Sequence, residues 1–244
     1  MAIALVTGGS RGLGLALAEA LAERGWTIVL DARDGHELGE AEQAVRDRTA
    51  PGASVVAIAG DVTDGEHRRA LVAAAARRGG LDLVVNNAST LGATPLPNLA
   101  AYPLEELARV FEVNVVAPLA LVQDALPLLR LSARPAVLNI TSDASVGAYE
   151  GWGGYGSSKA ALDQLSAVMA VEEPSVLVWA VDPGDMRTQM HQDAFPGEDI
   201  SDRPAPVDVV PRLVGLVEGG LPSGRYRLSE LATAPTPAQE GVRT

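Results

Sequence analysis

Short apolar runs alternate with longer amphipathic stretches along most of the chain. The short runs are rich in valine, isoleucine, leucine and alanine, with few polar residues between the apolar ones. Such continuous runs are typical of parallel strands that are buried on both faces of a sheet. The expected strands are residues 3–7, 27–31, 54–59, 83–86, 136–141, 176–181 and 224–228.

The longer stretches repeat apolar residues three or four positions apart, which is the spacing of an amphipathic helix. Helices that connect parallel strands cross the sheet in a right-handed sense and cover both of its faces. The pattern therefore predicts a single doubly wound α/β domain with a mostly parallel seven-stranded sheet and ligands at the carboxyl ends of the strands. The expected helices are residues 12–24, 36–48, 66–78, 104–116, 119–129, 155–171 and 207–218.

Two segments interrupt this alternation. Residues 184–206 are long and polar, which predicts a mobile loop over a site. Residues 233–244 are rich in proline, alanine and threonine, which predicts a disordered tail. We therefore expect one domain over residues 1–232, with the loop at 184–206 closing over the substrate.

Composition narrows the class of protein. The apolar fraction of 47% and the charged fraction of 20% are ordinary for a soluble globular domain, and the net charge of -12 argues against a nucleic-acid partner. The chain has no cysteine, and its three histidines lack metal-ligand spacing, so we expect no metal site. The apolar start lacks a basic segment and no apolar run approaches about 20 residues, which predicts a cytoplasmic protein without a membrane partner.

A glycine-rich turn joins the first expected strand to the first expected helix. Glycines let the backbone turn sharply and approach a pyrophosphate, while the helix N-terminus supplies free N–H groups and a partial positive charge. This position in a βαβ unit favours a dinucleotide site, and a tight turn without a ligand is the alternative. The turn consists of Thr7, Gly8, Gly9, Ser10, Arg11, Gly12, Leu13 and Gly14.

With its TGxxxGxG spacing, the chain resembles the short-chain dehydrogenase/reductase family, whose members share a Rossmann-type domain. Later motifs extend the resemblance over about residues 1–190. Residues 86–89 resemble the family's NNAG, with serine in place of the last glycine, and residues 183–188 resemble its PGxxxT, which binds the nicotinamide carboxamide. Asp61 and Val62 match its adenine-contacting pair, although Asp61 could instead only cap the following helix. The resemblance implies cofactor contacts at Gly8, Ser10, Arg11, Gly12, Leu13, Gly14, Arg33, Asp61, Val62, Asn87, Ala88, Ser89, Tyr155, Lys159, Pro183, Gly184 and Thr188.

Tyr155 and Lys159 lie four residues apart on an expected helix, so their side chains share one face. A phenol is a poor base at neutral pH, but a neighbouring ammonium and an oxidised nicotinamide ring both favour its ionised form. Tyr155 could then take a proton from an alcohol or donate one to a nascent alkoxide. Such pairs also occur by chance, but Lys159 is the chain's only lysine, which argues against chance.

The resemblance assigns two further catalytic roles. Ser142, thirteen residues before Tyr155, would hold the substrate oxygen, and Lys159 would also hydrogen-bond the nicotinamide ribose. Asn114 would sit in a local kink of its helix and hold a water that leads towards the lysine. The alternative for Asn114 is a satisfied buried amide.

The preference between the two nicotinamide cofactors depends on the end of the second strand. In the family, an acidic residue there binds the ribose of NAD, whereas basic residues bind the 2′-phosphate of NADP. The acidic position falls on Ala32 and the basic one on Arg33, and Arg11 supplies a second cation. Asp31 should face the other side of the strand, although a one-residue shift would bring it to the ribose. NADP(H) is therefore favoured over NAD(H).

The leading hypothesis is an NADP(H)-dependent oxidoreductase that interconverts a small-molecule ketone or aldehyde and its alcohol. An NAD-dependent alcohol dehydrogenase of the same fold and a non-catalytic dinucleotide-binding redox sensor are the alternatives. The resemblance also implies a homodimer or homotetramer formed through residues 104–129 and 155–171. Residues in the loops suggest a partly apolar substrate pocket, with Arg187 as the candidate to bind a carboxylate; the apolar set is Tyr149, Trp152, Met186, Met190 and Phe195.

Overall fold

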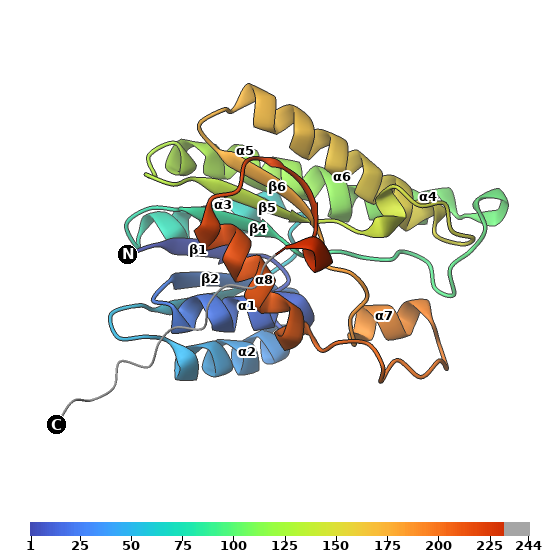
Figure 1. Ribbon diagram of the computed structural model, residues 1–244, viewed down its shortest axis with the longest axis horizontal. Helices are drawn as coiled ribbons and strands as arrows, with labels where there is room; N and C mark the ends of the chain where they lie inside the picture. Colours follow the sequence, from blue (N-terminus) through green and yellow to red (C-terminus); the bar gives the residue numbers. More distant parts are fainter. Residues whose placement is uncertain (232–244) are drawn as a thin grey trace.

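The computed structural model describes residues 1–231, which surround a seven-stranded sheet (Figure 1). Every pair of neighbouring strands is parallel, and their order is β3-β2-β1-β4-β5-β6-β7. The chain reverses its direction of travel across the sheet between β1 and β4, which opens a crevice at the carboxyl ends of these strands. The strands are β1 (Ile3–Val6), β2 (Thr27–Ala32), β3 (Val55–Ala59), β4 (Leu83–Asn86), β5 (Ala136–Ile140), β6 (Leu177–Asp182) and β7 (Gly224–Arg227).

Helices cover both faces of the sheet, as the apolar pattern predicts (Figure 1). Side chains of β1 alternate between the two layers: Ala4 and Val6 pack in one apolar core, and Ile3 and Leu5 pack in the other. The first core is covered by α1 (Gly12–Glu23), α2 (Gly35–Arg48) and α8 (Pro206–Gly219). The second face carries α3 (Gly65–Ala76), α5 (Ala117–Leu129) and α6 (Gly153–Glu172), and α4 (Leu104–Phe111) packs beside α6.

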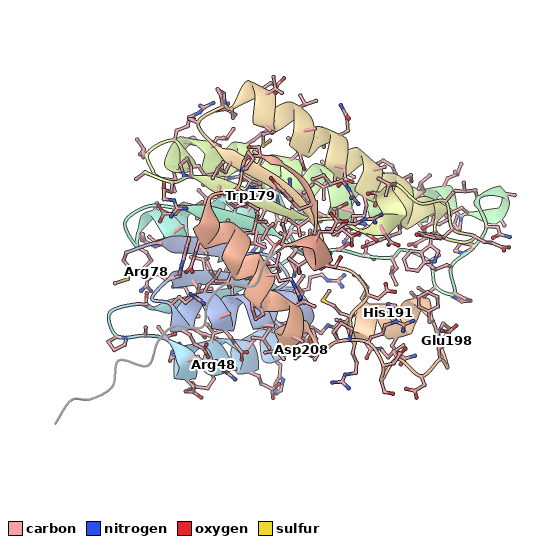
Figure 2. All side chains as sticks on the ribbon, in the orientation of Figure 1. Arg48, Arg78, Trp179, His191, Glu198 and Asp208 are labelled. Carbon is pink, nitrogen blue, oxygen red and sulfur yellow. The ribbon has the colours of Figure 1, made fainter. Side chains whose placement is uncertain are left out.

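Trp179 anchors the far edge of the sheet from the middle of β6 (Figure 2). Its side chain is fully buried, and its Nε1 donates to the carbonyls of Leu221 and Pro222, just before β7. The indole nitrogen thus has a partner although the ring lies in the core. This contact fixes the turn that brings β7 beside β6.

The helix expected at residues 104–116 is not α-helical throughout. After α4 the backbone forms a π-helical turn at Glu112–Val116, and α5 follows directly. The side-chain amide of Asn114 lies inside this turn, where its Oδ1 accepts from Thr90 N–H and its Nδ2 donates to Thr90 C=O. The turn widens the helix around that amide. The local kink expected at Asn114 is therefore present.

The polar segment at residues 184–206 contains a short helix that the sequence analysis missed. Helix α7 (Gln189–Ala194) lies outside the two main layers (Figure 1). Thr188 caps it, since its Oγ1 accepts from His191 N–H at 3.2 Å. A helix of this length is too short to show an amphipathic repeat, which is why the pattern did not reveal it. The tail predicted at 233–244 lies outside the described residues.

One helical run in the described residues is long and apolar. Leu104–Leu129, taken as one run, is long and apolar enough to cross a bilayer by length and composition. Half of its apolar window is buried inside the fold, and the core helices of other folds meet the same criteria, so the run is weak evidence for a span.

Candidate active site

The glycine-rich turn lies against the segment that follows β4. A Cβ on Gly8, whose φ is +64°, would come within 2.9 Å of Ala88 Cα, and one on Gly14 would come within 2.4 Å of the Gly8 carbonyl oxygen. The Asn87 amide nitrogen donates to the carbonyls of Thr7 and Gly8 at 2.9 and 3.0 Å. The turn therefore has no room for larger residues and keeps its backbone open to a ligand.

Asp31 binds the backbone of this turn. Its Oδ1 accepts from Gly8 N–H at 2.8 Å, and its Oδ2 pairs with His67 Nε2 at 2.9 Å. The side chain is 1% exposed, and burial raises the pKa of its carboxyl. Both oxygens are thus bound within the fold, although Asp31 also lines the cleft described below. Whether Asp31 faces away from a bound ribose stays a prediction.

A cleft of about 1130 Å³ runs along the carboxyl ends of the strands. Every cofactor contact expected from the sequence lines it except Gly14, which packs beneath the turn. Its volume can accommodate a dinucleotide together with a small substrate. The glycine turn, the helix N-terminus of α1 and the cleft therefore fit a nicotinamide cofactor.

The end of the cleft that is expected to hold the adenosine carries both predicted cations and one unexpected anion. Arg33 and Arg11 are exposed at its rim, and Ala32 leaves no carboxylate at the acidic position. Glu37, at the start of α2, lies 3.7 Å from Arg11 Nη1 and accepts from Ser10 Oγ at 3.4 Å. Glu37 was not predictable from the sequence, because a glutamate near a helix N-terminus is ordinary.

Asp61 is held in place by two contacts. Its Oδ1 accepts from the backbone and hydroxyl of Thr63, and its Oδ2 accepts from Arg109 Nη2 at 2.8 Å. Helix α3 is capped by Asp64 instead, which excludes a pure capping role for Asp61. Arg109 of α4 also lines the cleft, and no local signal in the sequence pointed to it.

Tyr155 and Lys159 project from one face of α6 into the opposite end of the cleft. Tyr155 is 7% exposed and Lys159 is 2% exposed. Lys159 Nζ lies 5.5 Å from the centroid of the Tyr155 ring and donates to Ile140 C=O at 2.8 Å. Ser142 follows β5 and lines the same cleft as Tyr155 and Lys159. The structure thus brings together the three residues that the sequence predicts as the reacting set.

Burial acts on the two ionisable groups in opposite senses. It lowers the pKa of Lys159 to about 8. It also raises the pKa of Tyr155 above its usual value, and the charges of Asp182 and Asp143 add to that rise, while hydrogen bonds from Ser89 and Ser142 oppose it. The expected lowering of the phenol pKa by the Lys159 ammonium and an oxidised nicotinamide ring stays a prediction.

Asn114 lies behind the wall of the cleft. Its Nδ2 donates to Ser158 Oγ as well as to Thr90 C=O, and its Oδ1 accepts from Ser89 Oγ as well as from Thr90 N–H. The side chain is fully buried and fully satisfied. This matches the alternative of a satisfied buried amide, and the predicted water stays a prediction.

The mouth beside Tyr155 is partly apolar. The Trp152 ring meets the Tyr155 ring edge-on, with their centroids 5.7 Å apart. The centroid of the Phe195 ring lies 5.8 Å from that of Trp152. Met190 lines the same space. Of the other residues expected near the substrate, Met186 and Arg187 line the cleft, whereas Phe195 and Tyr149 do not.

Arg225 of β7 supports the backbone of Ser142, a contact that was not predictable from the sequence. Its Nη2 donates to Ser142 C=O at 3.0 Å and to Ser145 Oγ at 3.2 Å, and its Nε donates to Asp163 Oδ2 at 2.8 Å. These partners lie 62 to 83 positions away along the chain. Asp143 and Asp182, which line the cleft near Tyr155, were also missed.

Comparisons with known proteins agree with this arrangement. Residues 2–199 match the family model described as short chain dehydrogenase. The chain is 39% identical over 176 residues to the rhamnolipids biosynthesis 3-oxoacyl-[acyl-carrier-protein] reductase of Pseudomonas aeruginosa, covering 70% of this chain and 66% of that one. It is 33% identical to the sepiapterin reductase of Rattus norvegicus, covering 78% and 76%.

A solved structure shares the whole architecture. The alcohol dehydrogenase from the archaeon Thermococcus sibiricus, complexed with 5-hydroxy-NADP, superposes with a TM-score of 0.82 at 27% identity. The superposition covers 93% of this chain and 95% of that one. The sequence motifs, the parallel sheet and these matches lead to one assignment. The chain belongs to the short-chain dehydrogenase/reductase family and is an NAD(P)-dependent oxidoreductase.

Proposed function

We propose that this protein is an NADP(H)-dependent oxidoreductase that interconverts a ketone or aldehyde and its alcohol, with Tyr155 as the acid/base group. One observation carries the proposal: Tyr155 and Lys159 are buried together on one face of α6, and Ser142 lines the same cleft. They share one cleft with the glycine-rich turn. Binding of a dinucleotide alone would not require this set, which argues against a redox sensor without catalytic activity.

The chain's own residues would manage the proton. When bound, the nicotinamide cofactor would supply or accept the hydride and, in its oxidised form, would carry a positive charge. In the reductive direction Tyr155 Oη gives its proton to the substrate oxygen, and in the oxidative direction it takes that proton back. Ser142 holds the same oxygen, and the Lys159 ammonium stabilises the phenolate. Burial of both groups keeps bulk water away from the exchange.

Two cations support the preference for NADP(H). Arg33 makes no hydrogen bond or ion pair within residues 1–231, so its guanidinium is free to bind a 2′-phosphate, and Arg11 lies on the same rim. Glu37 favours the competing NAD-dependent dehydrogenase, because its carboxylate neutralises Arg11 and would repel the phosphate. Direct titration decides: we expect NADPH to bind at least about tenfold more tightly than NADH, and the reverse order would overturn the preference.

The wall formed by Trp152 and Met190 supports a partly apolar carbonyl substrate of small or medium size. The relatives reported above are named as a 3-oxoacyl-[acyl-carrier-protein] reductase and a sepiapterin reductase, so both are named for reduction. We also propose that the enzyme works in the cytoplasm on a free small molecule.

A panel of ketones, aldehydes and secondary alcohols, followed by nicotinamide absorbance, tests the activity. We expect Tyr155→Phe to lose at least about a thousandfold in kcat with the best panel compound, since general acid/base groups contribute up to about 10⁴-fold. Its affinity for NADPH should stay within about twofold, because the ring and its packing remain. A variant that keeps its turnover would refute the role of Tyr155, and a wild-type protein that binds NADPH but reduces no panel carbonyl would favour the redox sensor.

A further inference from the structure

A buried carboxylate and a buried imidazole, Asp31 and His67, form a pair at the end of the cleft that is expected to hold the adenosine. The two residues are 1% and 7% exposed, and His67 Nε2 lies 2.9 Å from Asp31 Oδ2. An ionised carboxylate only accepts hydrogen bonds, so the imidazole nitrogen donates in this contact. The partners come from β2 and α3, 36 positions apart along the chain. The fold thus brings a donor from another element to a carboxylate that it buries.

Asp31 belongs to the wall of the cleft although both of its oxygens are bound. Its Oδ1 accepts from Gly8 N–H at 2.8 Å, and the residue lines the cleft next to Ala32 and Arg33. In dinucleotide-binding folds, an acidic side chain near the end of this strand accepts from the 2′-hydroxyl of the adenosine ribose. His67 itself does not line the cleft, so it can act on a bound cofactor only through Asp31.

Gly60 makes room for the His67 ring. A Cβ on this glycine, which follows β3, would lie 2.3 Å from His67 Nδ1 and 2.6 Å from two of the ring carbons. Gly60 N–H donates to the Ala32 carbonyl at 3.0 Å, which holds this backbone to the end of β2. The imidazole is therefore confined between α3 and the segment after β3, with Nε2 directed at Asp31.

Loss of His67 would leave Asp31 Oδ2 without the donor that the fold supplies. An unpaired buried carboxylate is costly, so it turns to a place where water or a ligand can reach it. For Asp31 that place is the cleft. A carboxylate turned into the cleft would accept from the 2′-hydroxyl of NAD(H), and it would repel the 2′-phosphate of NADP(H), which carries about two negative charges. Both effects favour NAD(H).

The two other carboxylates described at this end of the cleft have cationic partners of their own. Asp61 is bound by Arg109 at 2.8 Å, and Glu37 lies 3.7 Å from Arg11. The side chains of Asp61 and Glu37 are 34% and 45% exposed, so water screens their charges. Of these three carboxylates, Asp31 alone is buried, and its charge is therefore the least screened.

We propose that His67 is a specificity-determining residue: by holding Asp31 Oδ2 within the fold, it keeps that carboxylate from the adenosine ribose and so allows a 2′-phosphate to bind. His67 touches no cofactor in this role and is a positioning residue. The proposal rests on the preference for NADP(H) given above, which His67 would maintain through Asp31.

The test compares the Kd for NADPH with the Kd for NADH, measured by nicotinamide fluorescence, and needs no substrate. We expect His67→Leu to lower the preference for NADPH over NADH about tenfold, since a hydrogen bond to a charged group is lost. His67→Ala should change the preference in the same direction, and it leaves space for water beside the carboxylate, which helps the chain to fold. His67→Gln keeps an N–H donor and should stay within about threefold of the wild type.

A double variant shows whether the effect passes through Asp31. With Asp31→Asn already present, His67→Leu should change the preference by less than about twofold, because no charge is left to release. His36→Leu is the matched control, because His36 is an exposed histidine at the start of α2 that does not line the cleft, and it should leave both Kd values unchanged.

Several results would overturn the proposal. An unchanged preference in His67→Leu and His67→Ala would do so, and so would an equal loss of affinity for both cofactors, which is what a purely structural role of His67 predicts. The same would hold if His67→Gln changed the preference as much as His67→Leu, or if the change persisted with Asp31→Asn. A wild type that binds NADH more tightly would refute the preference in the proposed function, whereas the role of His67 is judged by the change that its substitution causes.

Discussion

At the scale of single residues, Lys159 combines a buried charge with a small number of partners. Its Nζ donates to the Ile140 carbonyl and faces the Tyr155 ring, and Asp163 is the charge that favours its protonated form. Burial nevertheless lowers the pKa of Lys159 from 10.5 to about 8. A drop of that size corresponds to about 3 kcal/mol of unfavourable free energy for the ammonium in the folded state, compared with the unfolded chain.

The sign of this effect sets its pH dependence. Below pH 8 both the folded and the unfolded chain carry the proton, and the folded protein bears the full cost of the buried ammonium. Between about 8 and 10.5 the unfolded chain binds more protons than the folded one, so stability rises with pH. Above pH 10.5 neither state carries the proton, so the buried ammonium no longer lowers the stability of the folded protein.

We therefore predict that Lys159→Met unfolds in urea with a free energy about 2 kcal/mol above wild type at pH 7, after allowing for the lost hydrogen bond to Ile140. The gain should shrink as the pH approaches 10, and turnover should fall to background. Lys159→Arg is the control, because it keeps the charge and should gain nothing. A variant less stable than wild type at pH 7, or a gain that does not change with pH, would contradict the account.

At the scale of elements, an arginine on the last strand, β7, contacts the segment that follows the carboxyl end of β5. Arg225 on β7 binds the Ser142 carbonyl, Ser145 and Asp163, and Asp163 in turn accepts from Ser145 Oγ at 2.6 Å. The side chains of Arg225 and Asp163 are 27% and 14% exposed. Strand β7 thus positions Ser142 although it lies outside the cleft.

Arg225→Met should lower the free energy of unfolding by about 2 kcal/mol, because Asp163 is left with a partly buried and uncompensated charge. We expect kcat on the best panel compound to fall about tenfold as the Ser142 backbone loses its donor, with the KM for NADPH unchanged. Adding Asp163→Asn should restore part of the stability but not the turnover. Arg227→Met, an exposed arginine on the same strand, is the matched control. Equal losses in both single variants would show that the network does not position Ser142.

Elements with a regular local pattern were predictable from the sequence, and those set by distant contacts were not. The seven strands and the main helices end within two residues of their expected bounds, apart from the break after Phe111, because apolar spacing is a local property. The π-helical turn depends on Thr90 binding Asn114 from another segment, and α7 is too short to carry a repeat. In the site, Tyr155 and Lys159 were predictable because they lie four residues apart on one helix. The contact between Arg225 and Ser142 was not, because the two residues are 83 positions apart in the sequence.

At the scale of the whole molecule, a net charge of -12 opposes the association of two copies at long range. A stable oligomer would therefore need an apolar contact surface free of acidic groups. Helix α6 carries two exposed apolar side chains, Val168 and Val171, which are 41% and 81% exposed, and Val116 of the adjoining π-helical turn is 48% exposed. Glu172, at the end of the same helix, is also exposed, so the contact would centre on Val168. The three valines lie in the two segments that the family resemblance implies for a dimer or tetramer.

We predict that wild-type protein sediments as a dimer or tetramer and that Val168→Glu sediments as a monomer at micromolar concentration. The substitution adds one more negative charge at the centre of an apolar contact, where it must lose its hydration without gaining a partner. The folded monomer should tolerate it, because Val168 is already 41% exposed and a helix accommodates glutamate well. Val207→Glu on α8 makes the same change at a site 64% exposed on the opposite layer, and it should keep the wild-type mass. A monomeric wild type, or two variants with the same mass, would place the interface elsewhere or remove it.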